Sequence, residues 1–322
     1  MDKIESDAAG RWEIKIYTPD NRKEWDDFVR TSRNGTFLFE RGYMDYHSDR
    51  FEDYSLMAYR GGALSGLLPA NFSDGVLQSH GGLTYGGWVL PKGKIDGGDE
   101  LMLWQTWMEF CRLHTIREID YKPMPFIYCV EPSEEDSYLL FRFGAETTEV
   151  NLSSCIDLRS MRGFNKMQRR HLKKGLSEGV KVWETDRVDV FMNMIAECLN
   201  ERHEASPVHS IEEMIRLRNT FPDKIRFFVG GRDNRIEGGV CIYETSTVAH
   251  CQYIGTTESG RRINVLSVLF DELINRVFCN KNYFDFGTSN ESNGRILNSG
   301  LLRHKFSLGG GGVAYRRFRL RP

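Results

Sequence analysis

One block of the sequence, residues 225–288, is defined by its hydrophobic pattern from end to end. It opens with three short apolar runs, separated by turns rich in glycine, asparagine and threonine: 225–229, 239–243 and 248–254. Such runs between turn residues predict antiparallel strands. Residues 264–277 come next, with apolar side chains at helical spacing, which predicts an amphipathic helix. Residues 283–286 predict a closing strand, so the block is one meander, one helix and one strand.

The same order of elements occurs earlier in the chain. Three apolar runs at 56–59, 64–69 and 76–80 predict a first meander, 101–115 a helix and 118–121 a strand. Corresponding elements lie roughly 165 to 170 residues apart, which is too long a period for a solenoid. We interpret the chain as two diverged copies of one domain. The alternative interpretation is two unrelated α/β domains.

Length and composition agree with two soluble globular domains. The chain has 322 residues, 40% of them hydrophobic, and a formal net charge of −2. This balance argues against a surface that coats nucleic acid indiscriminately. No apolar run approaches the ~20 residues that a membrane span needs, and the first residues do not resemble a signal peptide. The seven cysteines show no metal-ligand spacing. We therefore expect a cytoplasmic protein with reduced cysteines and no transmembrane segment.

A strongly basic segment separates the two copies. Residues 159–174 contain seven lysines and arginines and no acidic residue. Ser160 is a suitable N-cap, and several of the cations fall at spacings that share one helical face. The segment predicts a helix that opens the second domain. The predicted domains are 1–156 and 157–322.

Three motifs are the most specific features of the chain. The first is Phe-Asp-Phe-Gly at 284–287, followed by Gly-Leu-Leu-Arg-His-Lys-Phe at 300–306 and a glycine pair at 309–310. The second is the basic segment 162–174. The third is Glu-Arg-His-Glu at 201–204 with Val-His-Ser at 208–210. Together they resemble the FemAB/FemX family of tandem-domain ligases and their bacterial acyltransferase-like relatives.

The resemblance implies an α/β fold with mixed sheets, made of two tandem GNAT-like (acyl-CoA N-acyltransferase) domains, of which the C-terminal one carries the active site. It also implies transfer of an acyl or aminoacyl group to an amine on a cell-envelope glycan or peptide precursor. The donor would be acyl-CoA or another thioester, or an aminoacyl-tRNA, and the acceptor would bear phosphate. No metal is implied.

The sequence departs from the GNAT pattern at the loop that holds coenzyme A. That loop usually contains several glycines, whose backbone N–H groups hold the pyrophosphate. Here residues 258–264 contain a single glycine and two arginines. Arg261, Arg262 and Asn264 are the predicted cofactor-binding residues. The choice between coenzyme A and tRNA as donor stays open at this point.

Strand 248–254 supplies one group of candidate site residues. Amide formation needs a neutral amine, a polarised carbonyl and assistance to the leaving group. Tyr253 is a predicted catalytic acid or positioning group, and Gln252 a predicted substrate ligand near a backbone N–H that binds the carbonyl. The alternative for Tyr253 is an ordinary aromatic of a half-buried strand. His250 is either a base or a structural histidine.

Arg202 and Lys305 are the charged residues most strongly implied by the resemblance. A guanidinium binds phosphate through a bidentate fork, and an ammonium supplies a compact charge to an oxyanion. We predict that Arg202 binds substrate and that Lys305 is catalytic. His203 and His209 flank one turn, so either is a candidate base; we predict that His203 is the base and His209 a substrate ligand. Ordinary surface charge is the alternative for Arg202 and Lys305.

Further substrate ligands are predicted on two loops. Asn290 comes after the strand 283–286, and the carboxyl end of a strand is a common ligand position in open sheets. His80 and Tyr85 lie among four glycines in residues 79–88, where backbone approaches either a ligand or another part of the protein. The sequence lacks the nucleophile elbow, the Walker loop and the zinc-protease motif. The competing function is a non-catalytic module that binds a phosphorylated glycan or RNA.

Overall fold

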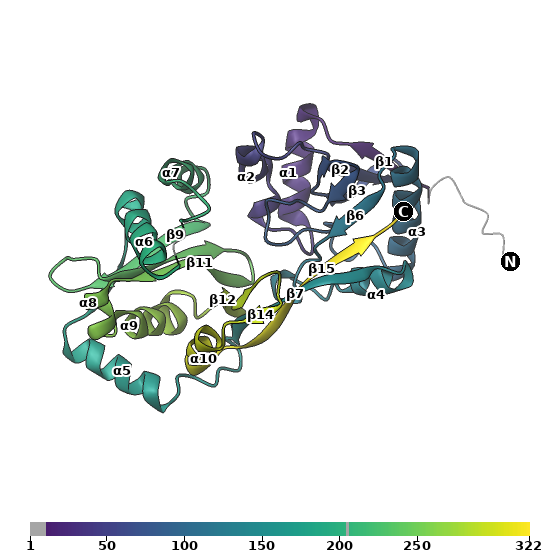
Figure 1. Cartoon of the computed structure of the whole chain (residues 1–322). Coiled ribbons are helices and arrows are strands. Elements are labelled where there is room, and N and C mark those ends of the chain that lie inside the picture. Colours follow the sequence, from purple (N-terminus) through teal and green to yellow (C-terminus); the bar gives the residue numbers. More distant parts are fainter. Residues whose placement is uncertain (1–10, 204–205) are drawn as a thin grey trace. The chain divides into compact units, whose positions relative to one another are not determined.

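The computed structural model describes residues 11–203 and 206–322 (Figure 1). The chain divides into two compact units. Unit 1 comprises the chain up to Val150 together with Ala314–Pro322, and unit 2 comprises Asn151–Val313. The chain passes between them inside strands β7 (Glu146–Asp157) and β15 (Gly311–Leu320). These units differ from the domains 1–156 and 157–322, which remain a prediction, because the end of β15 pairs with a strand of unit 1.

Unit 1 contains a three-stranded sheet, four strands of a larger sheet and four α-helices among its described residues. The antiparallel order β1-β2-β3 forms one sheet, and β4, β5, β6 and the end of β15 are neighbours in the other. The strands are β1 (Trp12–Ile16), β2 (Leu56–Arg60), β3 (Ala63–Leu68), β4 (Asn71–Ser73), β5 (Val76–Gln78) and β6 (Glu118–Tyr121). The helices are α1 (Arg22–Thr31), α2 (Arg41–Met44), α3 (Gly97–Leu113) and α4 (Glu135–Arg142).

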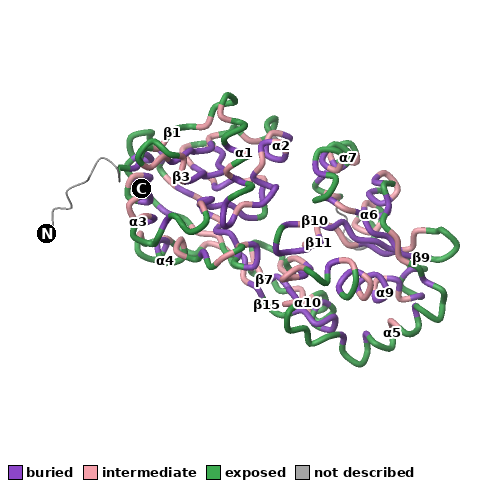
Figure 2. The backbone as a smooth tube through the Cα atoms, turned by 180° about the vertical axis from the view of Figure 1, so that it is seen from behind, coloured by how far each residue is buried: buried purple, intermediate pink, exposed green. Residues whose placement is uncertain are grey.

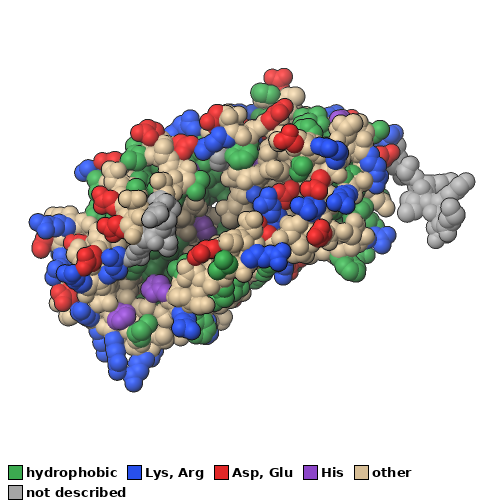
Figure 3. Space-filling model, viewed as in Figure 1, with side chains coloured by type: hydrophobic (Ala, Val, Ile, Leu, Met, Phe, Trp, Pro, Cys, Tyr) green, Lys and Arg blue, Asp and Glu red, His purple; other side chains and the backbone are tan. Residues whose placement is uncertain are grey.

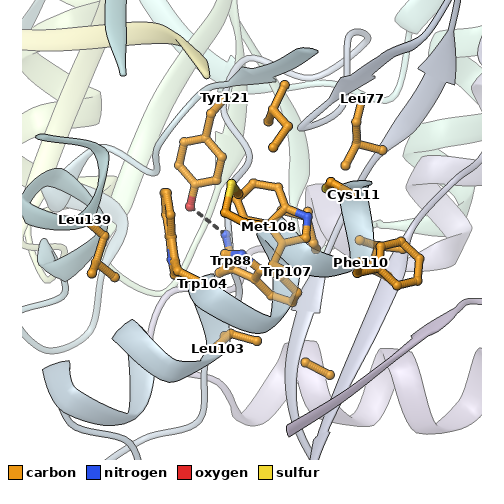
Figure 4. Close-up of a cluster of buried hydrophobic side chains, with 14 of the residues drawn as sticks. Leu77, Trp88, Leu103, Trp104, Trp107, Met108, Phe110, Cys111, Tyr121 and Leu139 are labelled. Carbon is orange, nitrogen blue, oxygen red and sulfur yellow. Dashed lines mark hydrogen bonds between the residues drawn. The ribbon is translucent and has the colours of Figure 1, made fainter. Parts of the chain in front are cut away.

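Tryptophans of α3 form the centre of the unit 1 core. Asp96 and Asp99 make a reciprocal capping box that begins the helix. Trp104 and Trp107 are fully buried and lie edge to face, with ring centroids 5.2 Å apart. Tyr121 of β6 packs on both rings, and its hydroxyl accepts a hydrogen bond from the Trp88 backbone N–H at 3.0 Å (Figure 4). Burial of such large rings supplies much of the stability of a unit of this size.

Unit 2 is built on six strands of the larger, mixed sheet, in the order β7-β12-β11-β10-β9-β8. Its strands, besides β7, are β8 (Lys181–Glu184), β9 (Ile225–Gly231), β10 (Gly238–Glu244), β11 (Val248–Thr256) and β12 (Tyr283–Thr288), and a small hairpin is formed by β13 (Asn290–Glu291) and β14 (Ile296–Leu297). Its helices are α5 (Lys166–Ser177), α6 (Val188–His203), α7 (Ile211–Thr220), α8 (Glu258–Arg262), α9 (Val265–Glu272), which ends in a π turn (Leu273–Val277), and α10 (Ser299–Ser307).

The helices of unit 2 cover both faces of this sheet. Helices α6 and α7 lie on one face and α9 on the other, with α5 packed outside α9 (Figure 1). Figure 2 shows the buried backbone of β10 and β11 between these layers. The phenylalanines of α9 and β12, which include Phe270, Phe284 and Phe286, form the core below the sheet. Among the described residues, no helix is both long enough and apolar enough to cross a membrane.

Two predicted elements differ from the structure. The apolar runs at 56–69 and 76–80 do not form one meander, because β2 lies between β1 and β3 in one sheet, whereas β5 pairs with β4 and β6 in another. The basic helix begins at Lys166 with Asn165 as its N-cap, and Ser160 is not the cap. Gly163 has a φ of 68° there, and Arg162 donates to the carbonyls of Gly309 and Gly310, so the chain before Asn165 is a loop.

Candidate active site

The two central parallel strands of unit 2 pair over a very short distance. The register of β11 and β12 covers three positions, the last of which joins His250 to Asp285. Both strands continue beyond that point. A β-bulge also places Gln252 opposite no residue of β10, and the extra residue of a bulge is left unpaired in the ladder. The sheet therefore has backbone without a regular partner where β11 and β12 stop pairing.

A buried carboxylate occupies the last paired position. Asp285 has no exposed surface. Its Oδ1 accepts hydrogen bonds from Ser153 Oγ at 2.5 Å and from the Gly287 N–H at 3.2 Å, and its Oδ2 lies 2.8 Å from His250 Nδ1. A buried charge is tolerated when it is paired and hydrogen-bonded. With the Nδ1 proton directed at Asp285, Nε2 is the nitrogen through which His250 can accept a proton.

Lys305 of α10 reaches the same place. It is 4% exposed, and its Nζ donates to the carbonyl oxygens of Gly287 at 2.8 Å and Thr288 at 2.7 Å. Burial lowers the pKa of Lys305 to about 8, although the charge of Asp285 acts in the opposite direction. An ammonium has three N–H donors. Two of them hold the end of β12, which leaves a third for an anionic oxygen.

Tyr253 lies beyond the bulge and contacts the segment before α7. Its hydroxyl is 2.6 Å from His209 Nδ1 and accepts the His209 backbone N–H at 3.3 Å. Burial raises the pKa of Tyr253 to about 12, so the phenol stays protonated at neutral pH. His209 also lines a cavity of about 540 Å³ between α6 and α7, together with Met192 and Glu213. Tyr253 and His209 thus connect the strand to this cavity.

The α8 segment forms the other side of unit 2. Arg261 and Asn264 line a cavity of about 190 Å³ with Gln168 of α5 and His304 of α10. Arg262 instead pairs with Glu258 on the surface. The Glu237 carboxylate hydrogen-bonds the hydroxyls of Thr257 and Ser259 at the start of α8. A negative charge therefore already occupies the helix end where the pyrophosphate of coenzyme A was predicted to bind.

Comparison with known proteins identifies the fold. No protein family model matches the sequence, and no curated protein matches it. Among solved structures, FemX superposes with a TM-score of 0.69 at 12% identity, over 96% of this chain and 97% of that one. L-PGS from Bacillus licheniformis gives 0.59 at 12% identity, over 95% and 93%. A tandem GNAT protein from the clavulanic acid biosynthesis pathway gives 0.52 at 11% identity, over 97% and 98%.

The chain has the FemX-like tandem GNAT fold. The predicted fold class is therefore confirmed, and the resemblance to FemX is confirmed as a resemblance of fold. At these identities the comparison extends to the fold alone, so residue roles rest on the geometry of this chain.

Several predicted site residues are not among the groups that surround Asp285. The side chains of Arg202 and His203, at the end of α6, lie outside the described residues. Asn290 has a structural contact, since its Oδ1 accepts the Leu152 N–H at 2.6 Å. In unit 1, His80 and Tyr85 are each 3% exposed and pack against other aromatic rings. Their predicted role in substrate binding is untested.

The pair of His250 and Asp285 is the main feature of the site that the sequence did not predict. The sequence left His250 open between a base and a structural residue, and presented Asp285 only as part of a motif. One signal was available, because an aspartate between two phenylalanines of a strand is a buried polar residue that needs a partner. Among the described residues, no group of three or more potential metal ligands exists.

Proposed function

We propose that unit 2 transfers an acyl or aminoacyl group from an activated donor to an amine, and that the amine belongs to a cell-envelope glycan or peptide precursor. The observation that carries the proposal is the meeting of His250, Asp285 and Lys305 at the position where β11 and β12 stop pairing. This position contains a base, its orienting carboxylate and a cation next to a bulged strand. The FemX-like fold supports the same class of reaction by analogy.

The reaction that these groups support is an aminolysis. The nitrogen of the acceptor attacks the carbonyl carbon of the donor, and a C–N bond forms as the bond to the leaving oxygen or sulfur breaks. His250 Nε2 accepts the proton that the nitrogen loses, and Asp285 stabilises the imidazolium. General-base assistance of this kind contributes typically ~10²–10⁴-fold. The proton ends on the leaving group.

Lys305 and the bulge serve the carbonyl oxygen in this scheme. The third N–H of Lys305 and a backbone N–H near Gln252 are the donors that we assign to the developing oxyanion. Removal of one such donor costs ~10²–10³-fold in other enzymes. Tyr253, held by His209 beside the cavity between α6 and α7, positions the acceptor and offers its hydroxyl to the leaving group.

The donor is either an acyl thioester or an aminoacyl-tRNA. The Glu237 carboxylate at the start of α8 weighs against a coenzyme A pyrophosphate at that helix end, because like charges would meet. Arg261 and Asn264 line the cavity on this side of the sheet. The non-catalytic alternative, a module that binds a phosphorylated glycan or RNA, gives no reason for a buried His–Asp pair.

The test is a transfer assay with both donors. The full chain is incubated with an amine-bearing nucleotide–peptide precursor and either acetyl-coenzyme A or a mixture of aminoacyl-tRNAs, and products are read by mass spectrometry. We expect the acceptor to gain an acyl or aminoacyl mass, and His250→Gln to abolish the gain. Transfer from neither donor, with binding of the precursor intact, would support the non-catalytic module.

A further inference from the structure

Helix α5 is fixed firmly to unit 2 by its inner face. Gln168 is 1% exposed and bridges two elements, since its Nε2 donates to Ser307 Oγ of α10 and its Oε1 accepts from Ser267 Oγ of α9, both at 2.9 Å. Gly175 allows close approach, because a Cβ there would lie 2.5 Å from Val268 Cγ2. These contacts fix which side of α5 packs against α9 and α10, and the opposite side is its outer face.

The outer face of α5 is strongly cationic. Five exposed side chains share it: Lys166, Arg169, Arg170, Lys173 and Lys174. None of the five forms an ion pair with another residue in the described part of the chain. Lys and Arg side chains gather over this helix at the lower left of Figure 3. Five unpaired like charges on one helix are unfavourable among themselves, so the face favours an anionic partner.

Large apolar side chains lie exposed among these cations. Met167 and Leu176 flank the face and are 48% and 55% exposed. Met161, in the loop before α5, is 44% exposed, and Phe306 of α10 is 58% exposed under the Arg162 guanidinium, whose carbon lies 4.6 Å from the ring centroid. Exposed apolar residues beside a concentration of charge characterise surfaces that enter the interfacial region of a bilayer.

An apolar cavity opens beside the same helix. It has a volume of about 270 Å³ and lies between α5, the preceding loop and α9. Its apolar lining consists of Ile156, Met161, Phe164, Leu172, Ile274 and Leu308. Arg169 also borders the cavity, whereas Asp271 contributes one acidic group. An apolar cavity with the Arg169 guanidinium at its border fits an amphiphile with an anionic head and an aliphatic chain.

We infer that the α5 face, defined as the five cations with Met161, Met167, Leu176 and Phe306, binds the surface of an anionic phospholipid membrane. The cations contact lipid phosphates, the apolar side chains enter the interface, and one acyl chain occupies the cavity beside Arg169. Clusters of four to eight cations on such a helix bind anionic lipids. The attachment is peripheral and reversible.

RNA is the competing occupant, because its phosphates would be attracted by the same cations. The apolar residues decide between the two. RNA recognition uses cations together with polar groups and aromatic platforms for the bases, and it gives no reason for exposed Met161, Met167 and Leu176 or for an apolar cavity. A membrane surface uses all of these features.

The experiment is flotation of the full chain with vesicles of phosphatidylcholine alone and of phosphatidylcholine mixed with phosphatidylglycerol. We expect partition onto the mixed vesicles only, weakened but not abolished by high salt, since salt screens exposed charges. Arg170→Glu with Lys173→Glu should lower the partition coefficient by about 30-fold or more. Met167→Ser with Leu176→Ser should abolish the binding that survives high salt, and Met161→Glu should weaken it.

The matched control places the same charge change in unit 1. Lys92→Glu with Lys94→Glu alters two exposed lysines of a loop and should leave partition unchanged. All substituted residues are exposed, so the thermal midpoint of each variant should match that of the parent. Equal loss in the control, equal binding to both kinds of vesicle, or binding of bulk tRNA without any vesicle binding would overturn the inference. No substrate is present in this assay, so its outcome is independent of the proposed transfer activity.

Discussion

The two units contain the same short parallel strand pair but differ in the groups that lie at its end. In unit 1, β5 and β6 pair at three positions, as β11 and β12 do in unit 2. The loop after β5 then lies on the end of β6: the Ser79 N–H donates to the Asp120 carbonyl and the Gly86 N–H to the Lys122 carbonyl, both at 2.8 Å. Backbone thus occupies the place where unit 2 has the candidate site.

Glycines make this closure of unit 1 possible. A Cβ on Gly86 would lie 2.0 Å from the Ser79 carbonyl oxygen, and Gly87 has a φ of 84° close to the Tyr121 hydroxyl. The glycine-rich loop therefore approaches another part of the protein, as one of the two sequence interpretations had it. In unit 2 the equivalent end of β12 is held by the side chain of Lys305.

The two units also differ in the partners of their buried charged groups. In unit 1 they form cation–carboxylate pairs, such as Arg33 with Glu100 and Arg41 with Asp53 at 2.6 Å. In unit 2 the fully buried Asp285 pairs with the imidazole of His250. Burial raises the pKa of Glu100 to about 7, so the unit 1 pairs are not all permanent charges, and what distinguishes unit 2 is the histidine partner. This difference supports the proposal that unit 2 carries the chemistry.

The largest expected effect is the loss of the base. His250→Gln should lower kcat/KM for transfer by roughly 10³-fold, because general-base catalysis contributes ~10²–10⁴-fold. Steady-state kinetics with the active donor measure it. His114→Gln in unit 1, a histidine stacked on Phe110, is the control and should retain the parental rate. A small effect of His250→Gln on kcat/KM would contradict the role of His250 as the base and the proposed chemical difference between the two units.

The second expected effect concerns charge at Lys305. Lys305→Met should lower kcat by about 10²-fold, as expected for loss of one oxyanion donor. Since burial lowers the pKa of Lys305 to about 8, the ammonium is lost as pH rises through that value, and parental activity should decline above pH 8. Lys305→Arg keeps the charge and should remove this decline from the pH–rate profile.

A lysine of unit 1 provides the matched test. Burial also lowers the pKa of Lys122 to about 8, and its Nζ donates to the Leu83 carbonyl at 2.5 Å. Lys122→Met should reduce the free energy of unfolding and leave the decline above pH 8 in place. A lost decline in that variant would place a catalytic ammonium in unit 1.

The sequence predicted the second block well because its signal is local. The predicted strands and helix between 225 and 288 correspond to β9, β10, β11, α9 and β12, with ends differing by a few residues. Each has an apolar period of its own and glycine or asparagine at its ends. Because each of these strands and the helix has an apolar face that must pack against its neighbours, their local patterns also predict how they pack together.

The parts of the site that the sequence missed depend on distant partners. Asp285 receives its hydrogen bonds from Ser153 and His250, which are 132 and 35 residues away. The bulge at Gln252 is a property of strand pairing, and no residue type marks it. Glu237 reaches α8 from the turn before β10. Such contacts arise from tertiary packing, which single-sequence periodicity does not encode.

A third prediction tests the closed strand pair of unit 1. Gly86→Ala should reduce the free energy of unfolding by about 2 kcal/mol, because the added methyl group overlaps the Ser79 carbonyl. Gly93→Ala is the control: its φ is 58° with no atom nearby, so only backbone strain of about 1 kcal/mol is expected. Chemical denaturation measures both. Transfer by folded Gly86→Ala protein should be unchanged, and a lost activity would place part of the site in unit 1.

The smallest expected effect concerns the hydroxyl of Tyr253. Tyr253→Phe removes the 2.6 Å contact with His209 and should lower kcat about tenfold, comparable to the loss of one or two hydrogen bonds. Because burial raises the pKa of Tyr253 to about 12, the phenol does not titrate near neutrality. The variant should therefore lose rate equally from pH 6 to pH 9, a range chosen to lie well below ~pH 10, the unperturbed value for tyrosine. Tyr138→Phe, an exposed tyrosine of unit 1, is the hydroxyl control. A rise in KM with kcat unchanged would reduce Tyr253 to binding, and His250 and Lys305 would then carry the chemistry alone.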